Sequence, residues 1–586
     1  MMPYPRFPGT EETQQQVSEA GKNIDLQWGV KIPMRDGVRL NATVYKPKTA
    51  EPVPVILTLT PYIGDSYHPR AFYFAQHGYA FVLVDCRGRG NSEGEFQPLM
   101  NEGPDGHDLV EWFATQPWCN GSVTMWGGSY GGFDQWVTLK EFPPHLKTIV
   151  PVAAAHQGVD IPFFKNVFFS YEMRWLTLVS GVTGNNNLFG EEAFWIEKFR
   201  ELYLGHLPYS ELDRVVGNGS TCFQMWVQHP APDAYWDRLA LTPADYGRID
   251  IPILTVTGHY DGDQPGAMCY YRSHMASASP ARERHYLVIG PWDHAGTRTP
   301  NKEFGGLKFG DASLVDLNKL HVEWYDWAMM GGPQPEFLKK RVAYYVMGAE
   351  EWKYADSLDT IAGNSKHLYL SSDGAANDVF RSGSLDEAPP ASSVADHYVY
   401  DPLDERPADL EQEQVKDYLT DQRYALNLFG NGLVYHSAPF SDATEVTGFP
   451  KLVVWIALDV PDADFQVTLS EIMPDGAHIL LSQDRLRARY RESLRQEKLV
   501  VPGEISRYEF DSFTFFSRQI AKGSRLRLVI TCPNSIYVQK NYNSGGVVAQ
   551  ESGEDARTAH VTVYHGGEHP SFLELPIVAP APSTGS

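Results

Sequence analysis

Cysteine is scarce in this chain of 586 residues. The five cysteines lie far apart and none forms a Cys-x-x-Cys pair. Neither a disulfide framework nor a structural zinc site is therefore expected. Long apolar runs are also missing: no stretch reaches about 18 consecutive apolar residues, so we expect no transmembrane helix. The opening residues, MMPYPRFPGTEETQQQ, lack the basic and apolar regions of a signal peptide, which makes the cytoplasm the default location.

Positive charge is in short supply. Lys and Arg total 49 against 73 Asp and Glu, and the formal net charge is −24. This argues against nucleic acid or an anionic membrane as a partner, because both require basic patches. An acidic surface keeps a protein soluble and modestly favours neutral or cationic substrates.

Cofactor motifs are missing as well. There is no Walker A sequence and no His-Glu-x-x-His. The run DCRGRGNSEGEF places Gly88, Gly90 and Gly94 in a GxGxxxG pattern, not the GxGxxG of a dinucleotide loop. We interpret it as a tight loop in which Asp85 and Arg87 pair. No metal and no organic cofactor is predicted.

Short apolar runs alternate with helical stretches over the first 350 residues. Val53–Thr60, Ala80–Val84, Val123–Trp126 and Leu146–Ala155 are typical of buried strands, and Ile253–Thr257 and Tyr286–Ile289 continue the series. Strands of this kind separated by helices indicate a parallel sheet that is covered on both faces. The fold class predicted is an α/β-hydrolase core.

Two further parts interrupt or follow that pattern. An aromatic, helical stretch that includes Glu191–Leu204 predicts a helical cap, and β-rich sequence after it predicts a C-terminal β-sandwich of the jelly-roll type. The expected domains are the first part of the core (1–150), the cap insertion (151–245), the second part of the core (246–350) and the sandwich (351–586).

The strongest chemical motif is WGGSYGG, Trp126–Gly132. It contains the G-x-S-x-G sequence around Ser129, follows a short strand and precedes a predicted helix at Phe133–Leu139. This is the context of a nucleophile elbow, where a strained turn exposes the serine. The backbone N–H of Tyr130, at the start of that helix, is suited to donate to a developing oxyanion.

A serine nucleophile needs a general base and an acid that orients the base. In this fold they follow the serine in the order acid, then histidine. Asp261 comes directly after the strand Ile253–Thr257, and His294 directly after Tyr286–Ile289. Asp263 is the alternative acid, and His259 and Asp293 are near neighbours of the two candidates.

Tyr62 follows the early strand Val53–Thr60, in the loop that supplies the second oxyanion donor in this fold. Its hydroxyl could donate there. From position alone, a buried packing role for this tyrosine is favoured over that of a donor.

The motifs taken together resemble the CocE/NonD hydrolases, a family of cocaine esterases and α-amino acid ester hydrolases related to the X-Pro dipeptidyl-peptidases. The resemblance spans MRDGVRLNATVYKP, the DxRGxGxSxG loop, WGGSYGG, DAYW, GHYDG, GPWDH and DPLDERP, in that order. It implies a triad of Ser129, Asp261 and His294 and an oxyanion hole formed by the Tyr62 hydroxyl and the Tyr130 N–H.

Substrate residues are less strongly marked. In the amino-ester hydrolases, carboxylates near the triad hold the ammonium group of the substrate. Asp263 matches one such position, whereas Gln264 stands where that subgroup has another acid. Cocaine-esterase-like members carry an apolar residue in place of Asp263. Further candidates, from the cap, are one more carboxylate and four aromatics, for which packing is an equal alternative: Asp160, Phe163, Phe164, Phe168 and Trp175.

The function predicted is cleavage of carboxylic esters through an acyl-Ser129 intermediate. The alternatives are an amidase, acylase or amino-ester hydrolase with the same triad, and a non-catalytic binding protein on the same fold. The expected partner is a small-molecule ester or amide; a homodimer is left open.

Overall fold

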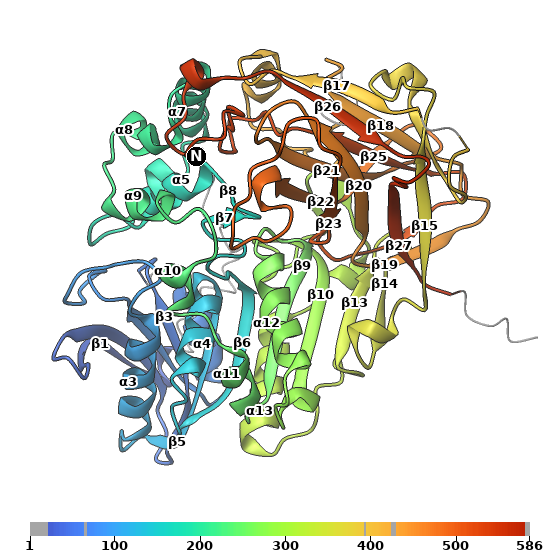
Figure 1. The fold of residues 1–586 in the computed structure, drawn as a ribbon. Helices are drawn as coiled ribbons and strands as arrows, with labels where there is room; N and C mark the ends of the chain where they lie inside the picture. Colours follow the sequence, from blue (N-terminus) through green and yellow to red (C-terminus); the bar gives the residue numbers. More distant parts are fainter. Residues whose placement is uncertain (1–20, 64–66, 392–393, 424–428, 580–586) are drawn as a thin grey trace, which may run out of the picture.

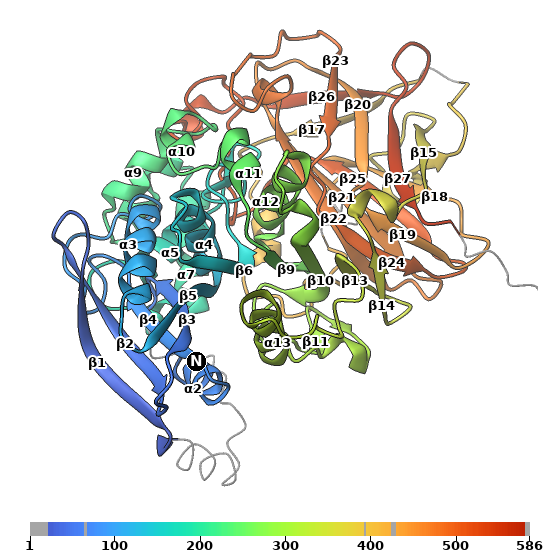
Figure 2. The ribbon, with the colours of Figure 1, turned by 90° about the horizontal axis from the view of Figure 1, so that it is seen from below.

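The structure is a computed structural model, and it describes residues 21–63, 67–391, 394–423 and 429–579. The N-terminal sequence MMPYPRFPGTEETQQQ lies outside these residues. Figures 1 and 2 show three parts: the core with its sheet and helices, the cap beside it, and the sandwich coloured yellow to red. In the described part of the chain, no helix combines the length and apolar character needed to cross a membrane.

Ten strands form one mixed core sheet in the order β1-β2-β4-β3-β5-β6-β9-β10-β13-β14. Seven neighbouring strands pair in parallel, in the order β4-β3-β5-β6-β9-β10-β13, and antiparallel strands flank them. Their bounds are β1 (Ile24–Pro33), β2 (Arg39–Pro47), β3 (Val53–Thr60), β4 (Ala80–Asp85), β5 (Cys119–Ser129), β6 (Leu146–Ala154), β9 (Ile253–Tyr260), β10 (His285–Asp293), β13 (Val342–Val346) and β14 (Glu351–Ala355).

Helices cover both faces of this sheet, as continuous apolar strands require. On one face pack α3 (Glu102–Ala114), α4 (Tyr130–Lys140) and α12 (Gln264–Ala276). On the other face pack α2 (His68–Gln76) and α13 (Leu317–Met330). The expected buried strands and the helix after Ser129 are confirmed, with ends that differ by a few residues.

The cap is inserted between β6 and β9 and has its own aromatic core. It holds a two-stranded ribbon, β7 (Phe163–Phe164) and β8 (Val167–Phe168). Its helices are α5 (Tyr171–Leu178), α6 (Asn186–Phe189), α7 (Glu192–Leu204), α8 (Leu212–Val216), α9 (Thr221–Val227), α10 (Ala234–Asp237) and α11 (Pro243–Arg248).

The C-terminal part is a β-sandwich around a large apolar core. Its strands are β15 (Asn364–Ser371), β16 (Gly383–Asp386), β17 (Asp396–Tyr400), β18 (Gly432–Ser437), β19 (Thr444–Gly448), β20 (Lys451–Leu458), β21 (Asp464–Ile472), β22 (His478–Arg487), β23 (Ser506–Phe510), β24 (Phe516–Ile520), β25 (Arg525–Thr531), β26 (Ala559–Tyr564) and β27 (Phe572–Ile577). A bridge between Phe169 and Val538 joins it to the cap, and one between Met347 and Arg518 joins it to the core.

Two details differ from the sequence expectations. β14 still belongs to the core sheet, so the core runs to Ala355, a few residues past the expected boundary at 350. Arg87 pairs with Asp36 and Asp105, at 2.7 and 2.5 Å, and not with Asp85. Asp105 lies on α3 and Asp36 in the turn between β1 and β2, and the two carboxylates bind the guanidinium from both sides, so the predicted Asp85–Arg87 pair was wrong.

Candidate active site

Ser129 sits at the sharp turn between β5 and α4. Its backbone angles are φ 61° and ψ −122°, a conformation that costs energy for any residue with a side chain. Gly127 is required by space, because a Cβ there would meet the backbone of Gly131; a Cβ at Gly128 would displace the Arg298 side chain. The turn therefore exposes a serine hydroxyl above the sheet and aims the first N–H groups of α4 at the same point.

His294 and Asp261 come together at the ends of two neighbouring strands, β10 and β9. His294 Nδ1–H donates to Asp261 Oδ1 at 2.7 Å. The Asp261 side chain is fully buried, whereas the His294 side chain is 38% exposed, so the second ring nitrogen remains accessible. Thr257 Oγ1 donates to the other Asp261 oxygen at 2.8 Å. The acid is thus fixed in place and orients the imidazole.

The pKa values of this pair shift in opposite directions. Burial acts to raise the pKa of Asp261, but the hydrogen bond and charge of His294, together with the hydrogen bonds from the Asp263 N–H and Thr257, outweigh it, and the pKa lies below its ordinary value. Burial acts to lower the pKa of His294, but the Asp263 and Asp261 carboxylates outweigh it and the pKa lies above its ordinary value. The geometry thus favours an imidazolium next to an ionised carboxylate.

Asp263 lies nearer to the serine than its sequence position suggested. Ser129 Oγ donates to Asp263 Oδ2 at 3.5 Å, and the same oxygen is 3.8 Å from His294 Nδ1. The hydrogen bond of the serine is therefore directed at Asp263 and not at His294. Burial raises the pKa of Asp263 to about 6, with the Asp261 carboxylate adding to the rise.

Tyr62 and Trp175 form the other side of the site. Trp175 Nε1–H donates to the Tyr62 hydroxyl oxygen at 2.9 Å. Burial raises the pKa of Tyr62 far enough to keep it protonated, and Ser129 is near enough to act on that pKa as well. Because the Trp175 N–H occupies the oxygen of Tyr62, its O–H remains free to donate toward the serine.

Contacts of the Tyr130 side chain fix the position of this residue. Its hydroxyl donates to Glu102 Oε1 at 2.5 Å, and its ring stacks on Trp175 with centroids 5.4 Å apart. Both contacts fix the residue whose backbone N–H begins α4 beside Ser129.

The other cap candidates have structural surroundings. Asp160 is buried, and its two oxygens accept the N–H groups of His156 and Gly266 at 2.7 and 2.6 Å. Phe163 and Phe168 are 1% exposed and pack edge to face inside the cap, which favours the packing alternative for both. Phe164 is half-buried in the same ribbon.

The near neighbours of the triad candidates have structural partners too. His259 Nδ1 accepts the Ser517 N–H from the sandwich, and burial lowers the pKa of His259 to about 3. Asp293 accepts the N–H of Gly296 in a local turn. Gln264 is buried and exchanges two hydrogen bonds with the backbone of Phe515, at 2.9 and 2.6 Å. A carboxylate at position 264 could not donate to that carbonyl.

Sequence reasoning missed three residues that face the site. Burial keeps the pKa of Glu172 well above its ordinary value, and its Oε2 has no hydrogen-bond partner in the described chain. The Asp263 carboxylate acts on the pKa of both Glu172 and Tyr171. Arg298 lies beside Gly128 and its charge acts on His294 and Asp263. Arg298 follows His294 by only four residues and could have been suspected; the two cap residues carry no motif.

Comparison with known proteins places these residues in context. The sequence profile described as X-Pro dipeptidyl-peptidase (S15 family) matches residues 36–296, and that of the X-Pro dipeptidyl-peptidase C-terminal non-catalytic domain matches residues 337–574. A cocaine esterase of Rhodococcus sp. (strain MB1 Bresler) is 30% identical over 95% of this chain and 99% of the esterase.

Solved structures share the same three-part architecture. An aminopeptidase from a marine sediment Thaumarchaeota archaeon superposes with a TM-score of 0.81 at 24% identity, and an α-amino acid ester hydrolase with 0.79 at 22% identity. Each alignment covers 95% of this chain and 97% of the other. At these identities the likeness establishes the fold.

Proposed function

The chain belongs to the CocE/NonD hydrolases of the X-Pro dipeptidyl-peptidase (S15) family, and from that membership we propose that it hydrolyses carboxylic esters through an acyl-Ser129 intermediate. The observation that carries the proposal is the 2.7 Å hydrogen bond from His294 to the buried Asp261, next to a serine on a strained turn. The arrangement has the parts that acyl transfer needs: nucleophile, base and orienting acid.

In the proposed reaction, the Ser129 hydroxyl turns from Asp263 to the free ring nitrogen of His294 and gives it the proton as Oγ attacks the carbonyl carbon. Asp261 stabilises the imidazolium. The Tyr62 O–H and the Tyr130 N–H donate to the tetrahedral oxyanion. His294 then protonates the leaving alcohol, and water releases the acid by the same steps in reverse.

Burst kinetics test this proposal. With p-nitrophenyl acetate we expect a burst of about one p-nitrophenol per chain, because acylation leaves one acyl group on each serine. Ser129→Ala should abolish both the burst and labelling by a fluorophosphonate probe. Ser122→Ala, on the same strand β5, is the matched control and should retain both. Turnover that survives in Ser129→Ala would refute the acyl-serine intermediate.

A second candidate function is the hydrolysis of esters or amides that carry a free α-amino group. The observation that favours it is a pair of carboxylates: Asp263, which accepts the Ser129 hydroxyl, and Glu172, whose pKa the Asp263 charge raises. Burial disfavours their charged forms, and a bound ammonium group would offset that cost. Alanine p-nitrophenyl ester and its N-acetyl form distinguish the two: an amine site requires a clear loss of kcat/KM on acetylation, and Asp263→Asn should remove the difference.

A further inference from the structure

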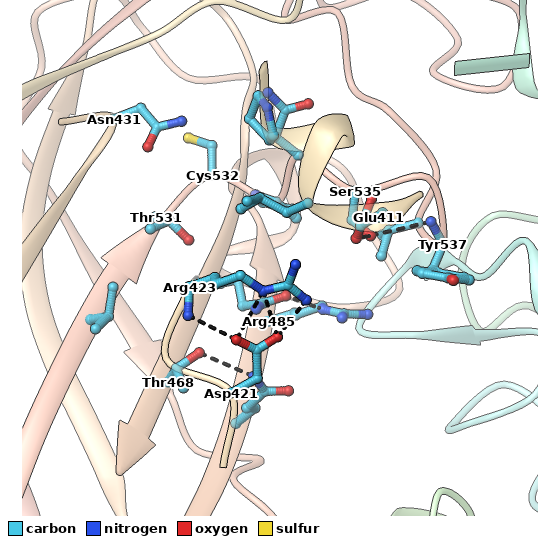
Figure 3. Close-up of a pocket in the computed structure, with 18 of the residues that line it drawn as sticks. Glu411, Asp421, Arg423, Asn431, Thr468, Arg485, Thr531, Cys532, Ser535 and Tyr537 are labelled. Atoms are coloured by element: carbon cyan, nitrogen blue, oxygen red, sulfur yellow. Dashed lines mark hydrogen bonds and ion pairs between the residues drawn. The ribbon is translucent and has the colours of Figure 1, made fainter. Parts of the chain in front are cut away.

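A separate cavity opens in the sandwich, at its boundary with the cap. Its volume is about 330 Å³, at the small end of the range for ligand pockets. Strands β21, β22 and β25 form its floor, and residues from 407–423, 429–431 and 532–538 together with Phe169 of the cap form its walls (Figure 3). Ser129, Asp261 and His294 are not among the described residues that line it.

Among the described residues that line this cavity, Arg485 is a charged group without a direct ion pair, although the Asp464 and Asp484 carboxylates act on its pKa from a distance. Its Nε–H donates to the neutral amide oxygen of Gln466 at 2.9 Å, and within the described ranges it makes no ion pair and no other hydrogen bond. Burial lowers its pKa to about 10, so it remains a cation at neutral pH. Arg423 is paired: it donates to Asp421 through two nitrogens, at 2.8 and 3.0 Å, as Figure 3 shows. Burial lowers the pKa of His478 to about 4, so this histidine adds no second cation at neutral pH.

Two of the remaining polar side chains have partners of their own, whereas His478 Nδ1 and Asn534 Oδ1 are buried without a hydrogen-bond partner among the described residues. Glu411, the other carboxylate of the lining, accepts the Ser535 hydroxyl at 2.6 Å and the Ile536 N–H at 2.8 Å. Gln483 donates to Thr468 at 3.2 Å. Neither Glu411 nor Gln483 binds the terminal nitrogens of Arg485. A guanidinium with these nitrogens unoccupied presents parallel N–H groups that suit a planar carboxylate.

Aromatic rings complete the lining. The Arg485 guanidinium lies 5.2 Å from the centroid of the Phe169 ring, and Tyr418, Phe429 and Tyr537 add apolar surface. Stacking on Phe169 holds the guanidinium by its face and leaves its edge available. The cavity therefore combines one cationic fork with an apolar surround.

From this combination we propose that the cavity binds a small organic monocarboxylate with an aromatic or apolar body, its carboxylate on Arg485. A more highly charged anion such as a phosphate monoester fits less well, because a single unmatched cation faces it and Asp421 and Glu411 lie in the same lining. The inference does not depend on the proposed ester hydrolysis.

The cavity lies next to the loop that carries His294. The Asp293 carboxylate acts on Tyr418, and burial together with that charge raises the pKa of Tyr418 to about 12. The Tyr418 ring also closes on Gly305 in the loop after His294. The carboxylate could therefore belong to a substrate, remote from its scissile bond, or to a free acid such as a hydrolysis product.

Binding is tested on the full chain carrying Ser129→Ala, by calorimetry with phenylacetate and its neutral isostere phenylacetamide. We expect phenylacetate to bind in preference to the amide. Arg485→Gln should weaken phenylacetate binding about 10- to 100-fold, the value of a charge-assisted hydrogen bond. The affinity of Arg485→Lys for phenylacetate should lie between those of the parent chain and Arg485→Gln, since lysine keeps the charge but lacks the paired N–H groups of a guanidinium. Arg507→Gln, an exposed arginine of the same domain outside the cavity, is the matched control.

Equal binding of acid and amide, or an unchanged affinity in both Arg485 variants, would overturn the proposal. Thermal unfolding of each variant shows whether it is folded. If Arg485→Gln does not fold, the preference of the parent chain for phenylacetate over phenylacetamide decides whether the proposal holds.

A second experiment, with Ser129 intact, distinguishes a substrate carboxylate from a free acid. It compares the mono-p-nitrophenyl ester of glutaric acid with the p-nitrophenyl ester of valeric acid. A loss of kcat/KM in Arg485→Gln for the carboxylated ester alone marks a substrate subsite. Loss of phenylacetate binding with no such selectivity marks a site for the free acid.

Discussion

Replacing Asp263 by Asn should move the acid limb of the pH–activity profile to lower pH. The general base must be a neutral imidazole, and the limb reports the pKa of His294 in the free enzyme. Asp263 raises that pKa because its carboxylate stabilises the imidazolium. Without the carboxylate, His294 loses its proton at lower pH, so the variant should retain more of its maximal activity below pH 6.

The size of the shift follows from the geometry. At 3.8 Å, two unit charges interact by about 1 kcal/mol in water and about 4 kcal/mol at an effective dielectric of 20. The Asp263 side chain is 23% exposed, and its own pKa of about 6 means that it carries only part of a charge where His294 titrates. The low end of the range applies, and it corresponds to about one pH unit.

The assay is kcat/KM for p-nitrophenyl acetate from about pH 4.5 to 9, with Asp293→Asn as the matched control. Asp293 adjoins His294 but is not among the groups that shift its pKa, and an Asn oxygen can still accept the Gly296 N–H. The reasoning is refuted if the limb of Asp263→Asn stays in place or moves upward, or if Asp293→Asn moves it as far.

Three further predictions follow from single contacts. Tyr62→Phe removes an oxyanion donor and should lower kcat on the order of 100- to 1,000-fold without changing the melting temperature, whereas Trp175→Phe, which removes only the bond that orients Tyr62, should cost less. Asp261→Asn should lower kcat on the order of 10⁴-fold, because an amide N–H facing His294 favours the wrong tautomer; a small loss would show that Asp263 can serve as the acid. Gln264→Glu buries a charge against backbone carbonyls and should reduce the free energy of unfolding by about 3–5 kcal/mol, measured by urea denaturation, while Gln550→Glu at an exposed position should be neutral.

Much of this protein was predictable because its signals are local. The apolar runs identify β3, β5, β6, β9 and β10, since a strand buried on both faces needs apolar side chains throughout. WGGSYGG encodes its own turn, because only glycine tolerates the close backbone approach around Ser129. The placement of Asp261 and His294 after two neighbouring strands was sufficient to predict that the two side chains meet.

The tertiary structure alone decided the contacts between segments that are distant in sequence. The serine hydroxyl points to Asp263, Trp175 orients Tyr62 from the cap, and Gln264 fastens the core to Phe515 of the sandwich. The unmatched charge of Arg485 depends on which side chains surround it. The Trp175 and Gln264 contacts require one domain to pack on another, and the other two require segments of one domain to meet. Neither kind of packing has a periodic or spaced pattern in the sequence that would predict it.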